Sequence, residues 1–289
     1  MAHIAFLGTG LLGSAFVEAA LRRGDEVTVW NRTTSKARAL EAFGARVADS
    51  PADAVRGVTR VHLVLKDDAV VDTVVAALRP GLAATTVIVD HTTALPALTA
   101  ERSMRLNSEG VKYLHCPVFI GPPAARESQG TILVAGPRHL FDVVQSDLSR
   151  MAARVEYFGE RPDLAAVFKL CGNAFIVGIN ALVADVFAVA AGSRVASADA
   201  LRVVEFFNPS TVVKARGAKM VAGDFTPTFE LAMARKDVRL MLESAGAAPL
   251  AALPQIAERL DVLISEGHAH DDLAVIGIDS VRRQATESQ

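Results

Sequence analysis

The sequence predicts an α/β domain with a doubly wound parallel sheet over residues 1–161, followed by an all-helical domain over residues 162–289. Three observations support this fold class. A glycine-rich turn lies between a short apolar run and a helical pattern near the N-terminus. Apolar runs then alternate with helical patterns as far as residue 159, which is typical of βαβ units. Beyond residue 162 only helical patterns remain, joined by one long apolar helix.

The stretch His3–Thr33 opens the α/β domain and reads HIAFLGTGLLGSAFVEAALRRGDEVTVWNRT. A glycine-rich turn between a strand and a helix lets the backbone approach a pyrophosphate, and the free N–H groups at the start of the helix attract that anion. Because a second strand follows, we expect a Rossmann-type cradle for a dinucleotide. Its predicted contacts are Gly8, Gly10, Leu11, Leu12 and Gly13.

The end of the second predicted strand indicates which dinucleotide is bound. A carboxylate there would accept a hydrogen bond from the ribose 2′-hydroxyl of NAD and would repel a 2′-phosphate. This chain has Asn31, Arg32 and Thr33 instead, and the permanently charged, planar guanidinium of arginine suits a phosphate. We therefore expect NADP(H), with these three residues among its contacts. The alternative is that Arg32 is a solvated loop cation.

The other elements of the α/β domain follow from apolar runs and the breaks between them. Strands are predicted at residues 46–48, 61–65, 87–90, 114–118, 132–135 and 155–159, and helices at residues 35–43, 69–78, 95–107 and 138–151. Continuous apolar runs are typical of parallel strands that are covered on both faces. Ligands bind beyond the carboxyl ends of such strands, so we expect the functional residues there.

Residues 164–184 form an apolar stretch, LAAVFKLCGNAFIVGINALVA, in which Lys169 is the one charged residue. The length would suffice for a membrane span, but Lys169, Asn173, Asn180 and the following Asp185 argue against one. We expect a long helix that is buried between the two domains or at a subunit interface.

Lys169 and Asn173 are four residues apart and therefore share one face of this helix. Burial of an ammonium is costly, and desolvation lowers the pKa of lysine so that it can act as a general acid or base. Asn173 could hold a substrate oxygen or the lysine itself. The alternative is a lysine that extends to solvent along an amphipathic helix.

Composition restricts the class of protein. With 51 % hydrophobic and 21 % charged residues, the 289-residue chain can build a large core. A net charge of −2 offers no basic field for nucleic acid. Cys116 and Cys171 lack the spacing of a disulfide framework or a zinc site, and a first strand at His3 leaves no room for an export signal. We expect a cytoplasmic protein that binds a small-molecule substrate, with no nucleic acid, membrane or metal partner.

A set of motifs runs in order along nearly the whole chain: FLGTGLLG (6–13), WNRT (30–33), VDHTT (89–93), PVFIGPPAARESQGTILVAG (117–136), FKLCGN (168–173), GDFTPTFELAMARKD (223–237) and HDDLAVI (270–276). Together they resemble the β-hydroxyacid dehydrogenase family of 3-hydroxyisobutyrate dehydrogenases and glyoxylate, succinic semialdehyde and tartronate semialdehyde reductases, with distant similarity to imine reductases. The resemblance implies a C-terminal domain like that of 6-phosphogluconate dehydrogenase and a homodimer or homotetramer.

The resemblance also implies roles for individual residues. Lys169 corresponds to the family's proton donor to the carbonyl oxygen, and Asn173 to its substrate-orienting partner. Thr92, in an Asp-x-Ser/Thr pattern, is implied to contact nicotinamide or substrate. Lys236 is implied to reach the cofactor or the substrate, and Asp237 to lie beside it at the substrate.

Two positions depart from the family pattern. The usual Ser-Gly-Gly that holds a substrate carboxylate is replaced by Phe119, Ile120 and Gly121. Phenylalanine lacks the hydroxyl, so this loop favours a more apolar carbonyl or imine as substrate. After the fourth strand, Leu65 and Lys66 are predicted cofactor contacts, and Lys66 stands where the family tends to have proline. The alternative is that Lys66 is a solvated lysine at the end of the strand.

We therefore expect an NADP(H)-dependent enzyme that transfers hydride between nicotinamide and a small carbonyl or hydroxyl substrate of the 3-hydroxyacid or semialdehyde type, with Lys169 as general acid and base. Two alternatives stay open. An imine reductase-like enzyme fits the altered loop, although such enzymes usually place Asp or Tyr at the position of Lys169. A non-catalytic NADP-binding sensor or docking module would not need Lys169 and Asn173.

Overall fold

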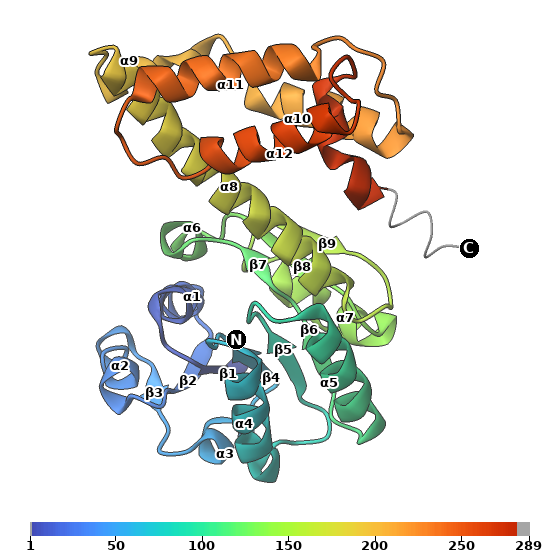
Figure 1. Cartoon of the computed structure of the whole chain (residues 1–289). Coiled ribbons are helices and arrows are strands. Elements are labelled where there is room, and N and C mark those ends of the chain that lie inside the picture. The colour runs from blue at the N-terminus through green and yellow to red at the C-terminus, as the bar shows by residue number, and fades with distance from the viewer. Residues whose placement is uncertain (1, 282–289) are drawn as a thin grey trace. The chain divides into compact units, whose positions relative to one another are not determined.

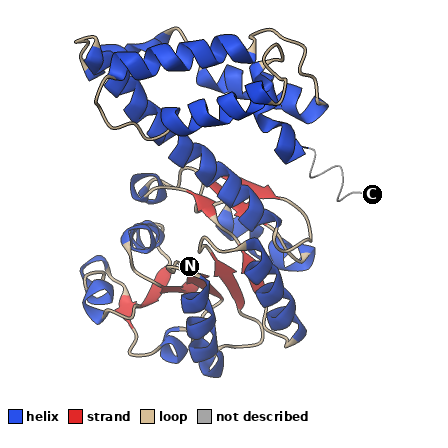
Figure 2. Cartoon of the chain, in the orientation of Figure 1, coloured by secondary structure: helices blue, strands red, loops and turns tan. Residues whose placement is uncertain are grey.

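The computed structural model describes residues 2–281 and divides into two compact units, the first ending at Asn173 and the second beginning at Ala174. The strands belong to the first unit, and the second unit is built from helices (Figures 1 and 2). The division falls inside the long helix α8 (Leu164–Gly192), whereas the sequence analysis placed the boundary before that helix, at residue 161.

The main sheet of the first unit has six parallel strands in the order β3-β2-β1-β4-β5-β6. They are β1 (His3–Leu7), β2 (Glu26–Trp30), β3 (Arg46–Val47), β4 (Arg60–Leu63), β5 (Val87–Asp90) and β6 (Tyr113–His115). The connections contain α1 (Leu11–Arg22), α2 (Thr34–Arg38), η1 (Glu41–Phe43), α3 (Pro51–Ala54), α4 (Asp68–Leu78), η2 (Arg79–Gly81) and α5 (Pro96–Ser108). The order reverses between β1 and β4, which confirms the predicted doubly wound fold and locates its ligand crevice beyond those two strand ends.

The sequence prediction of one strand over residues 114–118 was wrong. The chain leaves the main sheet after β6, and β7 (Val118–Phe119) starts a second sheet with β8 (Thr131–Val134) and β9 (Arg154–Tyr157). β7 runs antiparallel to β8. Pro117 lies at the break because it has no N–H to donate to a ladder. Two helices complete this region, α6 (Pro122–Arg126), which the sequence analysis did not predict, and α7 (Arg138–Leu148).

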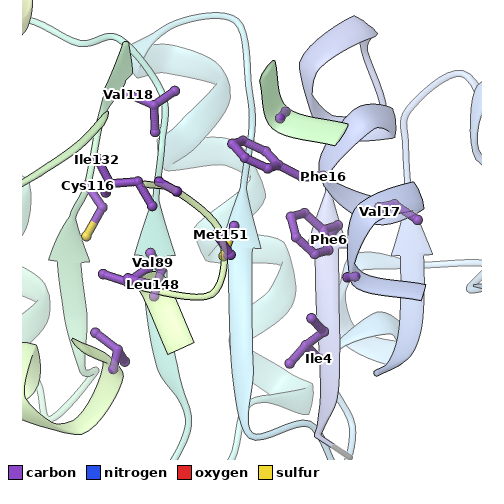
Figure 3. Close-up of a cluster of buried hydrophobic side chains, with 14 of the residues drawn as sticks. Ile4, Phe6, Phe16, Val17, Val89, Cys116, Val118, Ile132, Leu148 and Met151 are labelled. Atoms are coloured by element: carbon purple, nitrogen blue, oxygen red, sulfur yellow. The ribbon is translucent and has the colours of Figure 1, made fainter. Parts of the chain in front are cut away.

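The strands β1 and β5 of the main sheet each send side chains into two separate apolar clusters. From β1, Ile4 and Phe6 join the cluster shown in Figure 3, which also contains Phe16 of α1. Ala5 and Leu7 join the cluster on the opposite face. Because side chains alternate along a strand, both faces are buried only if successive residues are apolar. The continuous apolar runs in the sequence have this origin.

The described part of the second unit contains the rest of α8, then α9 (Ser197–Leu201), η3 (Arg202–Glu205), α10 (Pro209–Ala222), α11 (Leu231–Ala245), α12 (Leu253–Ser265) and η4 (Leu273–Gly277). Two buried carboxylates connect these helices. Asp185 of α8 accepts hydrogen bonds from the backbone N–H groups of residues 251–253 at the start of α12. Asp272 caps η4 through Ala274 N and also bonds Arg216 and Thr228.

Large apolar side chains of α8 are exposed in the second unit. They include Phe175 (55 %), Ile176 (52 %), Val177 (69 %) and Ile179 (50 %). The helix is long and apolar enough to span a membrane by length and composition, but Asp185 lies buried on it with its backbone partners. The expected burial of this helix between the two domains or at a subunit interface stays a prediction.

Two histidines are buried against each other beside Phe6 and Phe16. His62 Nδ1 lies 3.0 Å from His91 Nε2, and His91 Nδ1 lies 2.7 Å from the carbonyl oxygen of Cys116. The imidazole of His62 also stacks on Phe6, with ring centroids 4.6 Å apart. Burial lowers the pKa of His91 to about 4 and lowers that of His62 as well. Both rings are therefore neutral in the folded protein at neutral pH.

This burial predicts an acid-sensitive fold. Between the unfolded pKa of histidine, near 6.5, and the folded value of about 4, the unfolded chain binds a proton that the native His91 does not. Stability must therefore fall as the pH is lowered through this window. We expect His91→Gln to lose about 2 kcal/mol less free energy of unfolding between pH 7 and pH 5 than the native protein, measured by urea denaturation at both pH values. An equal loss of free energy of unfolding in both proteins would contradict the lowered pKa of His91.

Candidate active site

The glycine turn between β1 and α1 leaves no room for side chains on its inner side. Gly8 has a φ of +101°, and a Cβ built on it would lie 2.2 Å from the carbonyl oxygen of Val64. A Cβ on Gly13 would lie 2.0 Å from the carbonyl oxygen of Gly8. Gly10, the N-cap of α1, has no side-chain cap and would have nothing within 4 Å of an added Cβ. The start of α1 is therefore open, with free N–H groups that suit a pyrophosphate.

Asn31 fixes the glycine turn to the end of β2. Its Oδ1 accepts a hydrogen bond from the backbone N–H of Thr9 (3.0 Å), and its Nδ2 donates to the carbonyl oxygen of Thr33 (3.0 Å). Asn31 lines the cavity described next, but its amide is already engaged within the protein. Its role in this structure is to shape the turn.

A cavity of about 430 Å³ lies in the first unit beyond the ends of β1, β2 and β4. Most of the predicted cofactor contacts line it: Gly8, Gly10, Asn31, Arg32, Thr33, Leu65 and Lys66. Leu11 and Leu12 are not among the lining residues. Leu11 is 84 % exposed, and Leu12 packs against the apolar cluster of Figure 3.

The structure adds a second cation, Lys36 of α2, to the cavity wall. Lys36 was not predicted from the sequence, although it lies in the first turn of the helix that follows Arg32 and Thr33. Lys66 also lines the cavity, and its side chain is 84 % exposed, with Nζ 3.7 Å from Asp67. The residues at this wall therefore fit a dinucleotide with an additional phosphate on its ribose.

Thr92 is buried and positions the turn after β4. Its Oγ1 accepts a hydrogen bond from the backbone N–H of Leu65 (3.1 Å), and its own N–H donates to Asp90 Oδ1 (2.9 Å). The other carboxylate oxygen of Asp90 accepts from the hydroxyl of Tyr113 (2.6 Å). Thr92 is only 2 % exposed, so the structure gives it a bracing role. Its contact to nicotinamide or substrate stays a prediction.

Lys169 and Asn173 lie on one face of α8, within the first unit. Lys169 Nζ donates a hydrogen bond to Asn173 Oδ1 (2.9 Å) and lies 4.4 Å from the ring centroid of Phe119. Partial burial lowers the pKa of the Lys169 ammonium below its ordinary value. A lysine in this environment releases and accepts a proton more readily than a solvated one.

The loop from Phe119 to Gly121 connects this lysine with the dinucleotide cradle. Phe119 ends β7, Ile120 packs against the apolar cluster of Figure 3, and Gly121 precedes α6. The short helix α6 lies against α1 (Figure 1). Arg126 of α6 donates to both carboxylate oxygens of Glu18 on α1, at 2.7 and 3.1 Å. The loop is thus attached to the helix that starts at the glycine turn.

Lys236 and Asp237 belong to α11 in the second unit. They form an ion pair with each other, with Lys236 Nζ 3.0 Å from Asp237 Oδ1, and both side chains are partly exposed. This geometry is that of a solvated helix surface. Their implied contacts to cofactor and substrate stay predictions.

Comparisons with known proteins bear on the family and the fold of this chain. Residues 3–159 match the family described as the NAD binding domain of 6-phosphogluconate dehydrogenase. A curated relative, glyoxylate/succinic semialdehyde reductase 1 of Arabidopsis thaliana, is 28 % identical over 264 residues, covering 86 % of this chain and 89 % of the relative. The resemblance drawn from the motifs is therefore confirmed at the level of the family.

Solved structures with the same fold include imine reductases. An imine reductase from Myxococcus stipitatus in complex with NADP+ has a TM-score of 0.85 at 20 % identity. A Streptomyces aurantiacus imine reductase has a TM-score of 0.84 at 25 % identity. Each match covers 95 % of this chain and 98 % of the other. The two-domain fold of this chain is therefore shared with these proteins.

Arg32 and Lys36, the two cations of the cavity wall near the end of β2, predict how the protein distinguishes its cofactors. We expect Arg32→Ala and Lys36→Ala each to raise the KM for NADPH by roughly 10-fold or more while changing the KM for NADH little, because each cation would contact a 2′-phosphate. Steady-state kinetics with both cofactors measures this. Arg38→Ala is the matched control, since Arg38 lies on α2 but does not line the cavity. Equal effects on NADPH and NADH would contradict the assignment.

Proposed function

We propose a reaction for this chain from its family, because it belongs to the family of the NAD-binding domain of 6-phosphogluconate dehydrogenase. The proposed reaction is the transfer of hydride between NADP(H) and a small carbonyl or hydroxyl substrate, with Lys169 as general acid and base. Family membership makes it an NAD(P)-dependent oxidoreductase. The observation that carries the proposed chemistry is the half-buried Lys169, bonded to Asn173 and attached through the loop at Phe119 to the dinucleotide cradle.

NADP(H) is favoured over NAD(H) by the charges at the end of β2. Arg32 and Lys36 line the cavity together with the hydroxyl of Thr33. Asn31 at the strand end carries no negative charge that would repel a 2′-phosphate. The guanidinium and the ammonium can both donate to that phosphate.

A nicotinamide bound in the cradle would supply a hydride to the carbonyl carbon during reduction and would take it back during oxidation. The residues of this chain manage the proton. Lys169 Nζ donates a proton to the carbonyl oxygen as negative charge develops there. Asn173 Oδ1 accepts one N–H of the ammonium and so restricts its orientation. In the direction of oxidation, the neutral amine of Lys169 accepts the proton of the substrate hydroxyl. The lowered pKa of Lys169 makes this reverse step accessible closer to neutral pH.

The substrate class rests on the Arabidopsis relative, whose name specifies glyoxylate and succinic semialdehyde. We therefore propose a small aldehyde or ketone, or the alcohol that it forms on reduction, as substrate. The resemblance of the motifs adds substrates of the 3-hydroxyacid type. Imine reduction is the second candidate. It is favoured by the apolar Phe119 and Ile120 and by the likeness to the Streptomyces enzyme, and the ammonium of Lys169 could protonate the nitrogen that forms.

We also propose that the protein is a cytoplasmic homodimer or homotetramer, with neither a membrane nor nucleic acid as partner. The apolar side chains of α8 in the second unit are too exposed for a stable surface in water, and contiguous exposed apolar area marks interaction sites. A second copy of the chain would cover them with an equally apolar face, which is typical of homodimer interfaces.

Removing the amine of Lys169 tests the proposed chemistry. We expect Lys169→Ala to lower kcat for carbonyl reduction by roughly 10²–10⁴-fold and to leave the Kd for NADPH nearly unchanged. The native kcat/KM for reduction should fall with rising pH at a pH below 10.5, where the ammonium loses its proton. The rate of oxidation should rise over the same range. A panel of semialdehydes, 2-oxoacids, ketones and cyclic imines, with NADPH oxidation as readout, supplies the substrate for these measurements.

Cys171→Ala is the control for this experiment, because Cys171 is exposed on the same helix. Its kinetics should equal those of the native protein. Unchanged turnover in Lys169→Ala would remove the lysine from the mechanism, and activity on imines alone would favour the second candidate.

A charge placed on the apolar face of α8 tests the proposed assembly. We expect the native protein to be a dimer or tetramer in light scattering coupled to size exclusion, and Val177→Glu to dissociate it, since a buried unpaired carboxylate costs several kcal/mol. Val221→Glu is the matched control, because Val221 is also an exposed valine but lies on α10. A native monomer would contradict the proposal.

A further inference from the structure

The ring of Phe119 covers the functional end of Lys169. The ring centroid lies 4.4 Å from Lys169 Nζ, a cation–π distance. Asn173 Oδ1 contacts the same nitrogen at 2.9 Å from its own position on α8. Phe119 and Asn173 thus each cover part of the Lys169 ammonium, and the ring of Phe119 has no hydrogen-bonding atom.

Gly172 makes this position of the ring possible. A Cβ on Gly172 would lie 2.1 Å from Cζ and 2.6 Å from Cε1 of Phe119, which is far inside contact distance. Glycine inside a helix costs about 1 kcal/mol relative to alanine. Gly172 therefore lowers the stability of the helix but leaves room for the ring of Phe119, so the two residues fit each other.

Phe119 is also held firmly on its own side. Its backbone pairs with Thr131 in the sheet of β7 and β8. Its side chain packs with a small apolar cluster that includes Leu133 and Ala165. A Cβ on Gly130 would lie 2.7 Å from the carbonyl oxygen of Phe119. The backbone at Gly130 therefore packs directly against the backbone of Phe119. Both the backbone and the side chain of Phe119 therefore have packing partners in the first unit.

The side chains that follow Phe119 offer nothing to an anion. Ile120 and Gly121 have no polar side-chain atom, and Pro122 and Pro123 lack even the backbone N–H. A carboxylate that entered here would lose its hydration and would find the ammonium partly covered by the ring. Desolvation without hydrogen-bond partners is costly for a charged group.

From this packing we propose that Phe119 is a specificity-determining residue that shields Lys169 from carboxylates. The preferred substrate then carries no carboxylate on the part of the molecule that lies against Phe119. This inference rests on the proposed function: among small aldehydes and ketones it selects the uncharged ones, and so it departs from the carboxylate substrates that the name of the Arabidopsis relative specifies.

A pair of substrates that differ in one charge tests the selectivity. We expect the native protein to reduce the methyl ester of succinic semialdehyde with a kcat/KM at least about 10-fold above that of the free acid. Phe119→Ser should lower this ester-to-acid ratio by about 10-fold or more, because the ammonium becomes accessible to the carboxylate. Phe168→Leu is the matched control. Phe168 is adjacent to Lys169 on α8, but its ring stacks on Phe158, so its ratio should stay at the native value.

The fit between Phe119 and Gly172 gives a coupled test. Gly172→Ala in the native background should displace the ring and lower the ester-to-acid ratio. In the Phe119→Ser background the same change should leave the ratio as it is, because no ring opposes the new methyl group. Additive effects of the two changes would overturn the proposed fit.

A binding measurement separates this inference from the proposed function. Malonate is titrated into the protein saturated with NADP+, by calorimetry, for the native protein and Phe119→Ser. We expect malonate to bind Phe119→Ser at least about 10-fold more tightly. If malonate binds Phe119→Ser more tightly but no carbonyl compound is turned over, the proposed function is refuted and the shielding of Lys169 is retained. If carbonyl compounds are turned over, but the native protein and Phe119→Ser have the same malonate affinity and the same ester-to-acid ratio, the function is retained and the shielding is refuted.

Discussion

The close approach of three backbone segments at the glycine turn is the constraint on which the first unit depends. Gly8 lies against the carbonyl of Val64 after β4, and Gly13 lies against the carbonyl of Gly8 itself, with no space for a Cβ at either contact. This approach directs the start of α1 toward the point where the strand order reverses, and Asn31 connects the same turn to β2. The cavity for the dinucleotide follows from these contacts, because its wall consists of residues at the ends of β1, β2 and β4. The helix dipole and the free N–H groups of α1 then provide the charge complementarity.

A second close contact connects this cradle with the proposed acid. α6 is joined to α1 by the bidentate pair of Arg126 and Glu18, and the loop before α6 carries Phe119. The ring in turn lies over Lys169 and against Gly172. The position of the ammonium relative to the cradle therefore depends on packing along β7, α6 and α1 rather than on any ion pair with the lysine. This arrangement leaves the proton of Lys169 available, since a carboxylate partner would hold the ammonium charged.

Buried polar groups fix the remaining parts of each unit. In the first unit, Asp90 bonds Thr92 and Tyr113, and so holds the ends of β5 and β6 together beside the turn at Leu65. In the second unit, Asp185 and Asp272 each satisfy several backbone N–H groups. Such carboxylates cost desolvation energy and are tolerated because they are fully bonded. They specify which helix ends meet, which apolar contacts alone do not determine.

The sequence by itself determined the elements that depend on local pattern. The glycine spacing, the apolar runs covered on both faces and the helical periodicity beyond residue 162 gave the sheet, the cradle and the helical second part. It also identified Lys169 and Asn173, because two residues four apart must share a helix face. Only the tertiary structure decided that the chain changes sheets at Pro117, that the hydroxyl of Thr92 turns to the backbone of Leu65, and that the ring of Phe119 occupies the space beside Gly172. The physical reason is that periodicity records which side of an element is apolar, whereas contacts between residues tens of positions apart depend on how complete elements pack in space.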